Sequence, residues 1–254
     1  MNNNIIKLSA LITAHNEEKR LETCLEKLKF ADEIVVLLDK CTDNSKIIAQ
    51  RFTDRLIEGS WEIEGERRNI GIEYCRGQWI LEIDADEHVS QDLGLEICCI
   101  IKKTSHSYHL IPIDNYIGDR LVRYGWGASF GAMAKAALFR SGAKHWGSER
   151  VHPKLIFNGT KGPTLTHTIK HYVDRNLSDT IHRFDSYTTA HAIDLRNSLN
   201  IGSYFHNVRR IFHRFIKCYV ISQGWKEGGY GFLIALLASI YPFVSYLKAR
   251  YEKE

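Results

Sequence analysis

The sequence predicts an α/β protein built on a mostly parallel, Rossmann-like sheet that is flanked by helices. Three observations carry this prediction. Apolar runs alternate with helical patterns through the first hundred residues, the connections between them are short, and polar residues follow several of the apolar runs. Alternation of this kind is typical of parallel sheets. Ligand sites in such sheets lie beyond the carboxyl ends of the strands.

The first two strands enclose a helical segment. Residues 5–13 form an apolar run that we expect to be the first strand, and residues 33–39 form the second. Between them, residues 16–28 carry leucines three or four positions apart, which places those leucines on one face of a helix. Asn16 and the two glutamates after it suit a helix start, where a cap and negative charge are favoured.

The same alternation continues to the end of a fourth strand. The expected elements are a turn over residues 42–45, a helix through residues 47–52, a short strand over residues 54–58, a helix over residues 66–75 and a buried strand over residues 79–84.

Two carboxylates lie one residue apart at the end of that fourth strand, Asp84 and Asp86. Residues i and i+2 of an extended chain point to the same side, so both face one small volume unless the chain turns there. Their repulsion is relieved by a divalent cation, and hard oxygen ligands suit Mg²⁺ or Mn²⁺. The alternative is an acidic strand end in solvent. Thr13 and Asp39 end neighbouring strands, which favours the metal site.

Several segments in order resemble family 2 glycosyltransferases with the GT-A fold. Their order and spacing match, which is more specific than any single motif. The matching segments are residues 12–18, 35–39, 41–43, 65–71 and 84–87.

A narrower likeness links the chain to the bacterial branch that adds glucose to the lipopolysaccharide inner core. It rests on residues 150–152, 165–172 and 223–231, although the branch usually has Glu after Val-His where this chain has Pro153. The likeness implies an inverting transfer of a hexose, from a UDP-sugar such as UDP-glucose, to a lipid-linked saccharide.

The resemblance also implies roles for the residues at the strand ends. Asp86 would touch the metal, Asp84 would lie near the ribose, and Asp39 would accept a hydrogen bond from uracil. A helix cap for Asp39 and a solvated helix face for Arg68 are the alternatives. The remaining residues implied to line the nucleotide are Thr13, Ala14 and Asn16, with Arg68 near the base or a phosphate.

Sugar transfer needs a base that takes the proton of the acceptor hydroxyl. Residues 142–152 are rich in Gly, aromatic and titratable residues, as in a substrate-facing loop. We expect Glu149 to be the base, then His152, then Asp119. The alternative for Glu149 is an ion pair with a neighbouring charge.

Among twelve histidines, His167 and His171 are four residues apart and share a face of a helix or of a strand. By position in the family pattern, His171 would complete the metal or diphosphate site. A hydrogen-bonding or structural role is the alternative. No cysteine lies near with the spacing of a zinc site.

The last part of the chain differs in charge. Residues 200–254 contain eight Lys/Arg and three Asp/Glu, against 26 and 27 in residues 1–199. We therefore expect a catalytic domain over residues 1–199 and a helical, membrane-associating segment over residues 200–254. In residues 209–219 the cations are expected on one side of a helix and the apolar residues toward the other, which suits an anionic membrane surface.

Residues 228–247 carry no charge and are nominally long enough to span a bilayer. Glycine, proline and three tyrosines argue for an interfacial helix, before a packed helix or a true span. Six cysteines without regular spacing indicate reduced thiols, and the first residues show no secretory signal. The protein is therefore expected in the cytoplasm, peripheral on the inner face of the cytoplasmic membrane.

Two other function classes are compatible with parts of the sequence. A sugar nucleotidyltransferase would need a Gly-rich, basic loop after the first strand, and residues 13–18 supply neither feature. A non-catalytic, membrane-bound saccharide-binding protein could keep the fold, but the intact acidic positions argue against it. Nucleic-acid binding is not expected because no such motif is present.

Overall fold

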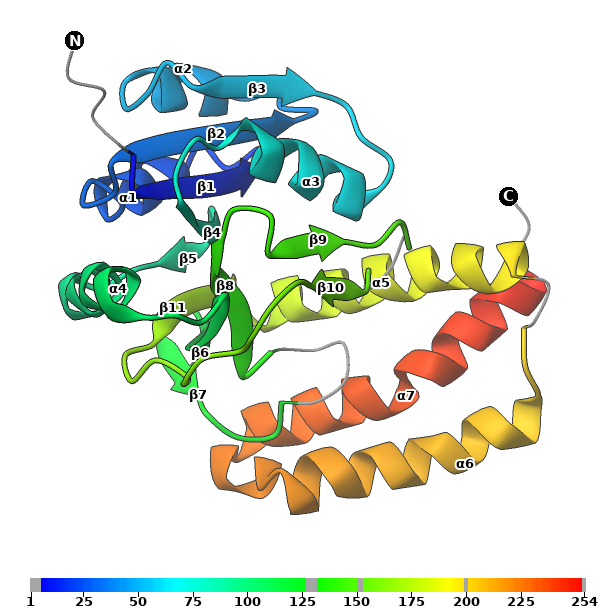
Figure 1. The fold of residues 1–254 in the computed structure, drawn as a ribbon. Helices are drawn as coiled ribbons and strands as arrows, with labels where there is room; N and C mark the ends of the chain where they lie inside the picture. Colours follow the sequence, from blue (N-terminus) through cyan, green and yellow to red (C-terminus); the bar gives the residue numbers. More distant parts are fainter. Residues whose placement is uncertain (1–5, 127–131, 150–152, 199–200, 253–254) are drawn as a thin grey trace, which may run out of the picture. The chain divides into compact units, whose positions relative to one another are not determined.

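The chain divides into two units, each of which is described by itself. The computed structural model describes residues 6–126, 132–149, 153–198 and 201–252 (Figure 1). The first unit consists of residues 1–113 and 134–171, and the second of residues 114–133 and 172–254. The expected boundary between residues 199 and 200 falls on two residues outside this description, so that division of the chain stays a prediction.

The first unit begins with the predicted alternation of strands and helices. The elements that lie in it, or begin in it, are β1 (Leu8–Ala14), α1 (Leu21–Glu26), β2 (Glu33–Asp39), α2 (Ser45–Gln50), β3 (Leu56–Gly59), α3 (Glu64–Tyr74), β4 (Trp79–Asp84), β5 (Glu87–His88), α4 (Gln91–Lys103), β6 (Tyr108–Ile117), β8 (Ala134–Arg140), β9 (Lys144–Trp146), β10 (Leu155–Phe157) and β11 (Ile169–Asp174).

These strands form a sheet in the order β3-β2-β1-β4-β8-β6-β11-β5, and β9 pairs separately with β10. The strands β3, β2, β1 and β4 are parallel, whereas β8 joins β4 and β6 in antiparallel fashion. Thr13 of β1 lies opposite Leu37 of β2 and Asp84 of β4. The carboxyl ends of three strands therefore meet at one edge, as the sequence predicted.

The core of the first unit lies between the sheet and its helices. The regularly spaced leucines Leu21, Leu25 and Leu28 are fully buried as expected, although the helix ends at Glu26 and Leu28 lies in the turn after it. The helix starts later than expected, at Leu21. Asn16 does not cap it: Asn16 has a left-handed backbone (φ 55°), and its Oδ1 accepts a hydrogen bond from the amide of Thr42 at 2.8 Å. Asparagine tolerates this conformation better than most residues.

The second unit is mainly helical. Its elements, besides the ends of β6 and β11, are β7 (Arg120–Val122), α5 (Leu177–Asn197), α6 (Tyr204–Phe215), the π-helical turn η2 (Ile216–Ile221), the 3-10 turn η3 (Gly224–Glu227) and α7 (Gly229–Tyr251). Its core gathers Trp126, Cys218, Ile234 and Tyr241 with neighbouring apolar residues. Figure 1 shows α6 and α7 running side by side.

Helix α7 contains residues 229–247 of the uncharged stretch and packs against both α5 and α6. Tyr241 stacks on His191 of α5 at 5.6 Å, and Lys248 Nζ lies 2.6 Å from Asp185 Oδ1. By length and composition α7 could cross a membrane, but 56% of its most apolar window is buried within the protein. Its membrane role is therefore weakly supported.

Helix α6 exposes part of its apolar side. Phe212 and Ile216 are 68% and 52% exposed, which is compatible with the expected amphipathic helix, and its membrane contact stays a prediction. The buried side instead runs through Asn207 and Cys218, with Arg214 partly covered. The helix face is chosen by the fit against α7, and hydrophobic content alone does not decide it.

Candidate active site

Asp84 lies at the carboxyl end of β4 among three hydrogen-bond donors. Its Oδ1 accepts a hydrogen bond from the Thr13 hydroxyl at 3.0 Å and pairs with the Arg68 guanidinium at 2.9 Å. Its Oδ2 lies 3.3 Å from Lys135 Nζ. The parallel register of β1 and β4 brings Thr13 to this position. Both oxygens of Asp84 are thus held by the protein.

Arg68 is buried on α3 and binds three carboxylates. Its guanidinium donates to Glu64 and Glu82 at 2.8 Å each, in addition to Asp84. Glu82, which is 1% exposed, also pairs with Lys144 Nζ at 2.7 Å. A buried charge is tolerated only when it is paired, and here each has a partner of opposite sign. This interlocked set fixes the position of Asp84.

Asp86 has a different environment although it is only two residues further on. The chain turns at residues 85 and 86, so Asp86 leaves the strand. Its Oδ2 lies 3.5 Å from His171 Nε2 and 3.8 Å from the Arg20 guanidinium. The Asp86 side chain is 24% exposed. The two side chains are similarly exposed, 30% for Asp84 and 24% for Asp86, but they have different partners, which the i, i+2 pattern alone did not show.

The antiparallel pairing of β5 and β11 brings His171 to this site, because His171 lies opposite Glu87. Glu87 is buried, accepts a hydrogen bond from the Asp84 amide at 2.9 Å and pairs with Lys135 Nζ at 2.5 Å. The hydrogen bond from the Asp84 amide to the Glu87 carboxylate thus closes the turn after β4, and Lys135 bridges Asp84 and Glu87.

The pKa values at this edge follow from the charges. Burial raises the pKa of Asp84, but Arg68, Lys135 and the Thr13 hydroxyl outweigh it and hold that pKa well below its usual range. Burial lowers the pKa of His171, while the hydrogen bond and charge of Asp86 raise it above its ordinary value. Asp86 therefore favours the protonated form of His171.

The ends of β1 and β2 carry the other residues expected near a nucleotide. Asp39 accepts hydrogen bonds from the Trp61 amide at 3.1 Å and from Arg67 at 2.8 Å. The His15 ring lies 2.6 Å from the Asp39 carbonyl oxygen, and Asn16 ties the loop after β2 to that after β1. These contacts shape the two loops beside Ala14. Whether Thr13, Ala14, Asn16, Asp39 and Arg68 touch a nucleotide stays a prediction.

The loop that follows β9 is fastened to α3. Asn69 exchanges two hydrogen bonds of 2.9 Å with the backbone of Trp146. Gly65 lies so close that an added Cβ would be 1.8 Å from the Gly147 carbonyl oxygen, so only glycine fits there. This explains why the Gly-Glu-Arg-Arg-Asn segment matters structurally.

Glu149 lies in the same loop and is half-exposed. It accepts a hydrogen bond from the Lys154 amide at 3.1 Å and lies 3.7 Å from Lys154 Nζ. The alternative of an ion pair with a neighbour is thus present, and its catalytic role stays a prediction. His152 lies outside the described residues.

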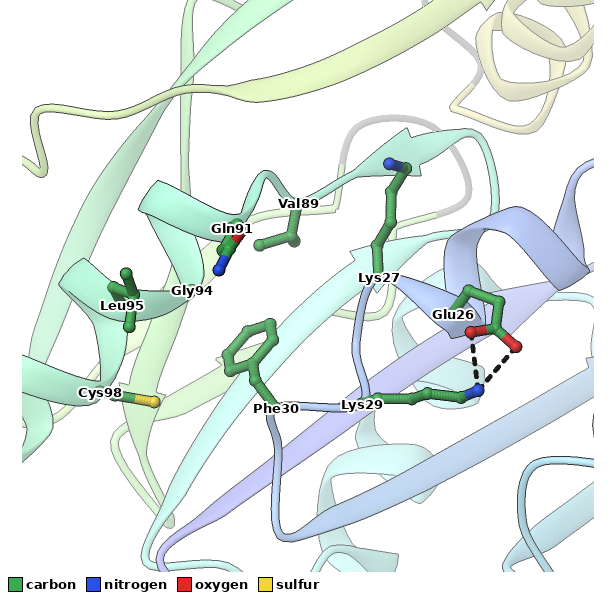
Figure 2. A pocket seen from close by; sticks show the side chains of 9 residues that line it. All are labelled: Glu26, Lys27, Lys29, Phe30, Val89, Gln91, Gly94, Leu95 and Cys98. Carbon is green, nitrogen blue, oxygen red and sulfur yellow. Dashed lines mark hydrogen bonds and ion pairs between the residues drawn. The ribbon is translucent and has the colours of Figure 1, made fainter.

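A separate hollow of about 420 Å³ in the first unit lies between α1 and α4 (Figure 2). Phe30 and Leu95 give it an apolar wall, and Lys29 at its edge is paired with Glu26 at 2.6 Å. None of the residues predicted for the donor site lines it. It is distinct from the strand-end site.

Sequence reasoning missed four residues of the strand-end site: Arg20, Glu82, Lys135 and Lys144. Glu82 and Lys144 are buried charges, but their burial follows only from the folded sheet. Lys135 comes from β8, whose antiparallel insertion beside β4 leaves no local sequence signal. Arg20 was readable only as one of several surface cations before α1.

The comparisons with known proteins agree with this geometry. Residues 9–119 match the family model Glycosyl transferase family 2. The lipopolysaccharide core biosynthesis glycosyltransferase LpsC of Rhizobium meliloti is 24% identical, over 96% of this chain and 92% of its own length. The uncharacterized glycosyltransferase RP128 of Rickettsia prowazekii is 25% identical, over 96% and 87%.

Among solved structures, that of S. aureus TarS residues 1–349 in complex with UDP-GlcNAc has a TM-score of 0.51 at 12% identity. The match covers 93% of this chain and 81% of that one, and at this identity it shows the fold alone. Together these findings confirm the resemblance and the fold expected from the sequence, and they identify residues 9–119 as a family 2 glycosyltransferase domain.

Proposed function

We propose that this enzyme transfers a hexose, with inversion, from a UDP-sugar such as UDP-glucose to a lipid-linked saccharide such as the lipopolysaccharide inner core. The observation that supports this most directly is the difference in partners between Asp84 and Asp86. Asp84 is held by Thr13, Arg68 and Lys135, while Asp86 lies beside His171 and Arg20. The relationship to LpsC supports the acceptor class.

The donor would bind across the carboxyl ends of β1, β2 and β4. Asp39 would accept a hydrogen bond from uracil, and Thr13, Ala14 and Asn16 would line the nucleotide. Asp84, kept ionised by its two cations, is suited to accept hydrogen bonds from the ribose hydroxyls. Arg68 acts on the nucleotide mainly by fixing Asp84, since its described hydrogen bonds go to carboxylates.

Asp86 and His171 fit Mg²⁺ or Mn²⁺ as partial ligands. Their Oδ2 and Nε2 atoms are 3.5 Å apart and come from adjacent segments. Among the described residues, no group of three or more His, Cys, Asp or Glu side chains could hold an ion. Two protein ligands completed by diphosphate oxygens and water match how Mg²⁺ is usually held. Charge on the departing diphosphate would be neutralised by the bound ion.

The first prediction tests the metal and donor assignment. Asp86→Ala should abolish metal-dependent UDP release from UDP-glucose, because the carboxylate that faces the diphosphate is lost. Stabilisation of the fold by UDP with Mn²⁺, measured by thermal shift, should disappear as well. Asp54→Ala, at an exposed carboxylate of the same unit, is the matched control and should behave like the wild type. Unchanged turnover in Asp86→Ala would sink the assignment.

Glu149 is the proposed base, and His152 is the second candidate. The second prediction is that Glu149→Gln lowers the rate of transfer to the acceptor by about a hundredfold or more, while binding of UDP and metal is unchanged. Glu26→Gln, which removes a carboxylate paired with Lys29, is the control. If Glu149→Gln transfers sugar at the wild-type rate, Glu149 only stabilises its loop. His152→Gln then tests the second candidate for the base.

The lipid-linked acceptor places the proposed enzyme in the cytoplasm, peripheral on the inner face of the cytoplasmic membrane. The basic segment within residues 200–250 supports contact with an anionic surface, because residues 200–254 carry a net charge of +5 whereas residues 1–199 carry −1.

A further inference from the structure

The second unit exposes a row of large apolar side chains. Phe212, Ile216, Val220, Ile221 and Trp225 are 68%, 52%, 55%, 69% and 55% exposed. We call these five residues the apolar row. Single exposed apolar residues are normal on a protein surface, but several in succession mark a surface that contacts something else.

The apolar row lies on one side of α6 and η2 and extends, after a break in the helix at Gln223, to η3. Phe212 and Ile216 are four residues apart on α6, so they share a side. Val220 and Ile221 continue through the π-helical turn η2, and Trp225 follows in η3. The opposite side of the segment, at Asn207 and Cys218, is buried. Figure 1 shows this segment forming one arm of the α6–α7 pair.

Cations flank the apolar row. Arg209, Arg210, His213 and Lys217 are all exposed on the same segment. Residues 195–226 contain no Asp or Glu, so no carboxylate of this segment neutralises them. A surface that combines protruding Phe, Ile and Trp with unneutralised cations complements a bilayer with anionic headgroups, where apolar residues enter the acyl boundary and cations remain among the phosphates.

We infer that the apolar row inserts into an anionic lipid bilayer and is the membrane-docking surface of this enzyme. The inference rests on the proposed function, in which the acceptor is lipid-linked. It replaces the uncharged stretch 228–247 as the inserting element, because the buried side of α7 is occupied by α5 and α6. Insertion through the exposed side of α6 leaves the packing of α7 against α5 and α6 intact.

The test uses the full chain and sedimentation with vesicles. One set of vesicles contains phosphatidylcholine and phosphatidylglycerol, and the other contains phosphatidylcholine alone. Phe212→Ser/Ile216→Ser should lower partitioning onto the anionic vesicles by about tenfold or more, because two inserted side chains are removed. Ile47→Ser/Leu95→Ser is the matched control, since these residues of the first unit are 62% and 60% exposed. The control should bind like the wild type.

Three results would overturn the inference. The double variant could bind the anionic vesicles as the wild type does. The wild type could bind both vesicle types equally, which would remove the role of the cations. Without lipid, the double variant could turn a dimer into a monomer in sedimentation velocity, which would show that a second copy covers the row.

Failure of this inference is distinguishable from failure of the proposed function. UDP release from UDP-glucose without vesicles should be the same in Phe212→Ser/Ile216→Ser and in the wild type. Asp86→Ala should lose UDP release but sediment with anionic vesicles normally. Vesicle binding without turnover in the wild type would count against the function and leave the docking surface in place, and the reverse result would do the opposite.

Discussion

The carboxyl end of β4 carries charged residues inside the protein, whereas the outer side of α6 carries large apolar residues in solvent. At β4, the buried Glu82 is paired with Arg68 and Lys144, and the partly buried Asp84 is paired with Arg68 and Lys135. On α6, apolar Phe212 and Ile216 stand in solvent among cations. The charges at β4 find their partners within the protein. The apolar side chains on α6 are shielded from water only when a membrane or another molecule covers them.

This difference separates stability from recognition. Breaking a buried ion pair leaves an uncompensated charge in a poorly polarisable interior, which is strongly destabilising. Removing an exposed apolar side chain takes away little that the isolated fold uses. Substitutions at the two regions should therefore affect different measurements, and the predictions below test that separation in order of decreasing effect on stability.

The largest effect is expected for Arg68→Met. Its loss leaves Glu82, Asp84 and Glu64 without their shared cation, and we expect the free energy of unfolding to fall by about 3 kcal/mol or more. Urea denaturation measures it. Arg51→Met is the matched control, because Arg51 pairs with Glu22 at 3.1 Å with both side chains 53% exposed. The control should cost less than about 1 kcal/mol. Equal losses of unfolding free energy in the two variants would show that the ion pairs of Arg68 stabilise the fold no more than an exposed pair does.

The next effect is a dependence on pH. Burial raises the pKa of Glu82, but Lys144 and Arg68 outweigh it and lower that pKa to about 2 from an ordinary value of 4.5. A lowered pKa in the fold contributes stability above the unfolded value and loses it as pH falls toward the folded one. Glu82 should thus contribute about 3 kcal/mol at neutral pH, lost between about pH 4.5 and 2.

The measurement compares the wild type with Glu82→Gln by urea unfolding across that range of pH. The difference in unfolding free energy should be largest near neutral pH and should shrink as the solution is acidified. Glu22→Gln, at an exposed carboxylate of α1, should give a small difference at every pH. A difference for Glu82→Gln that does not change with pH would show that the carboxylate is not stabilised in its charged form.

The sequence predicted the parallel part of the site because the geometry there is local. The ends of β1, β2 and β4 can be located from the polar residues that close each apolar run. Parallel pairing then brings Thr13, Asp39 and Asp84 to one edge of the sheet. Lys135 could not be found this way. It reaches Asp84 through β8, whose antiparallel insertion beside β4 is a tertiary choice.

The sequence pattern of α6 did not show which side of the helix is buried, for a related reason. A helical wheel shows which residues share a side of the helix, but it does not show which side packs against a neighbouring element. Asn207 and Cys218 are buried and Phe212 is exposed, so packing against α7 selected a stripe that is not the most apolar one. Several large apolar residues exposed in succession, as in the apolar row, indicate a contact surface rather than a contribution to stability.

The smallest expected effect on stability is at the apolar row itself, and two isoleucines of the second unit provide the comparison. Ile234 is fully buried in the core beside Trp126 and Cys218, whereas Ile216 is 52% exposed. Ile234→Ala should cost about 2–5 kcal/mol, because burial and packing are both lost. Ile216→Ala should change the unfolding free energy by less than about 0.5 kcal/mol. If urea denaturation gave both variants the same loss, the outer side of α6 would be covered in the free protein, and the contrast between a self-contained site and an incomplete surface would fail.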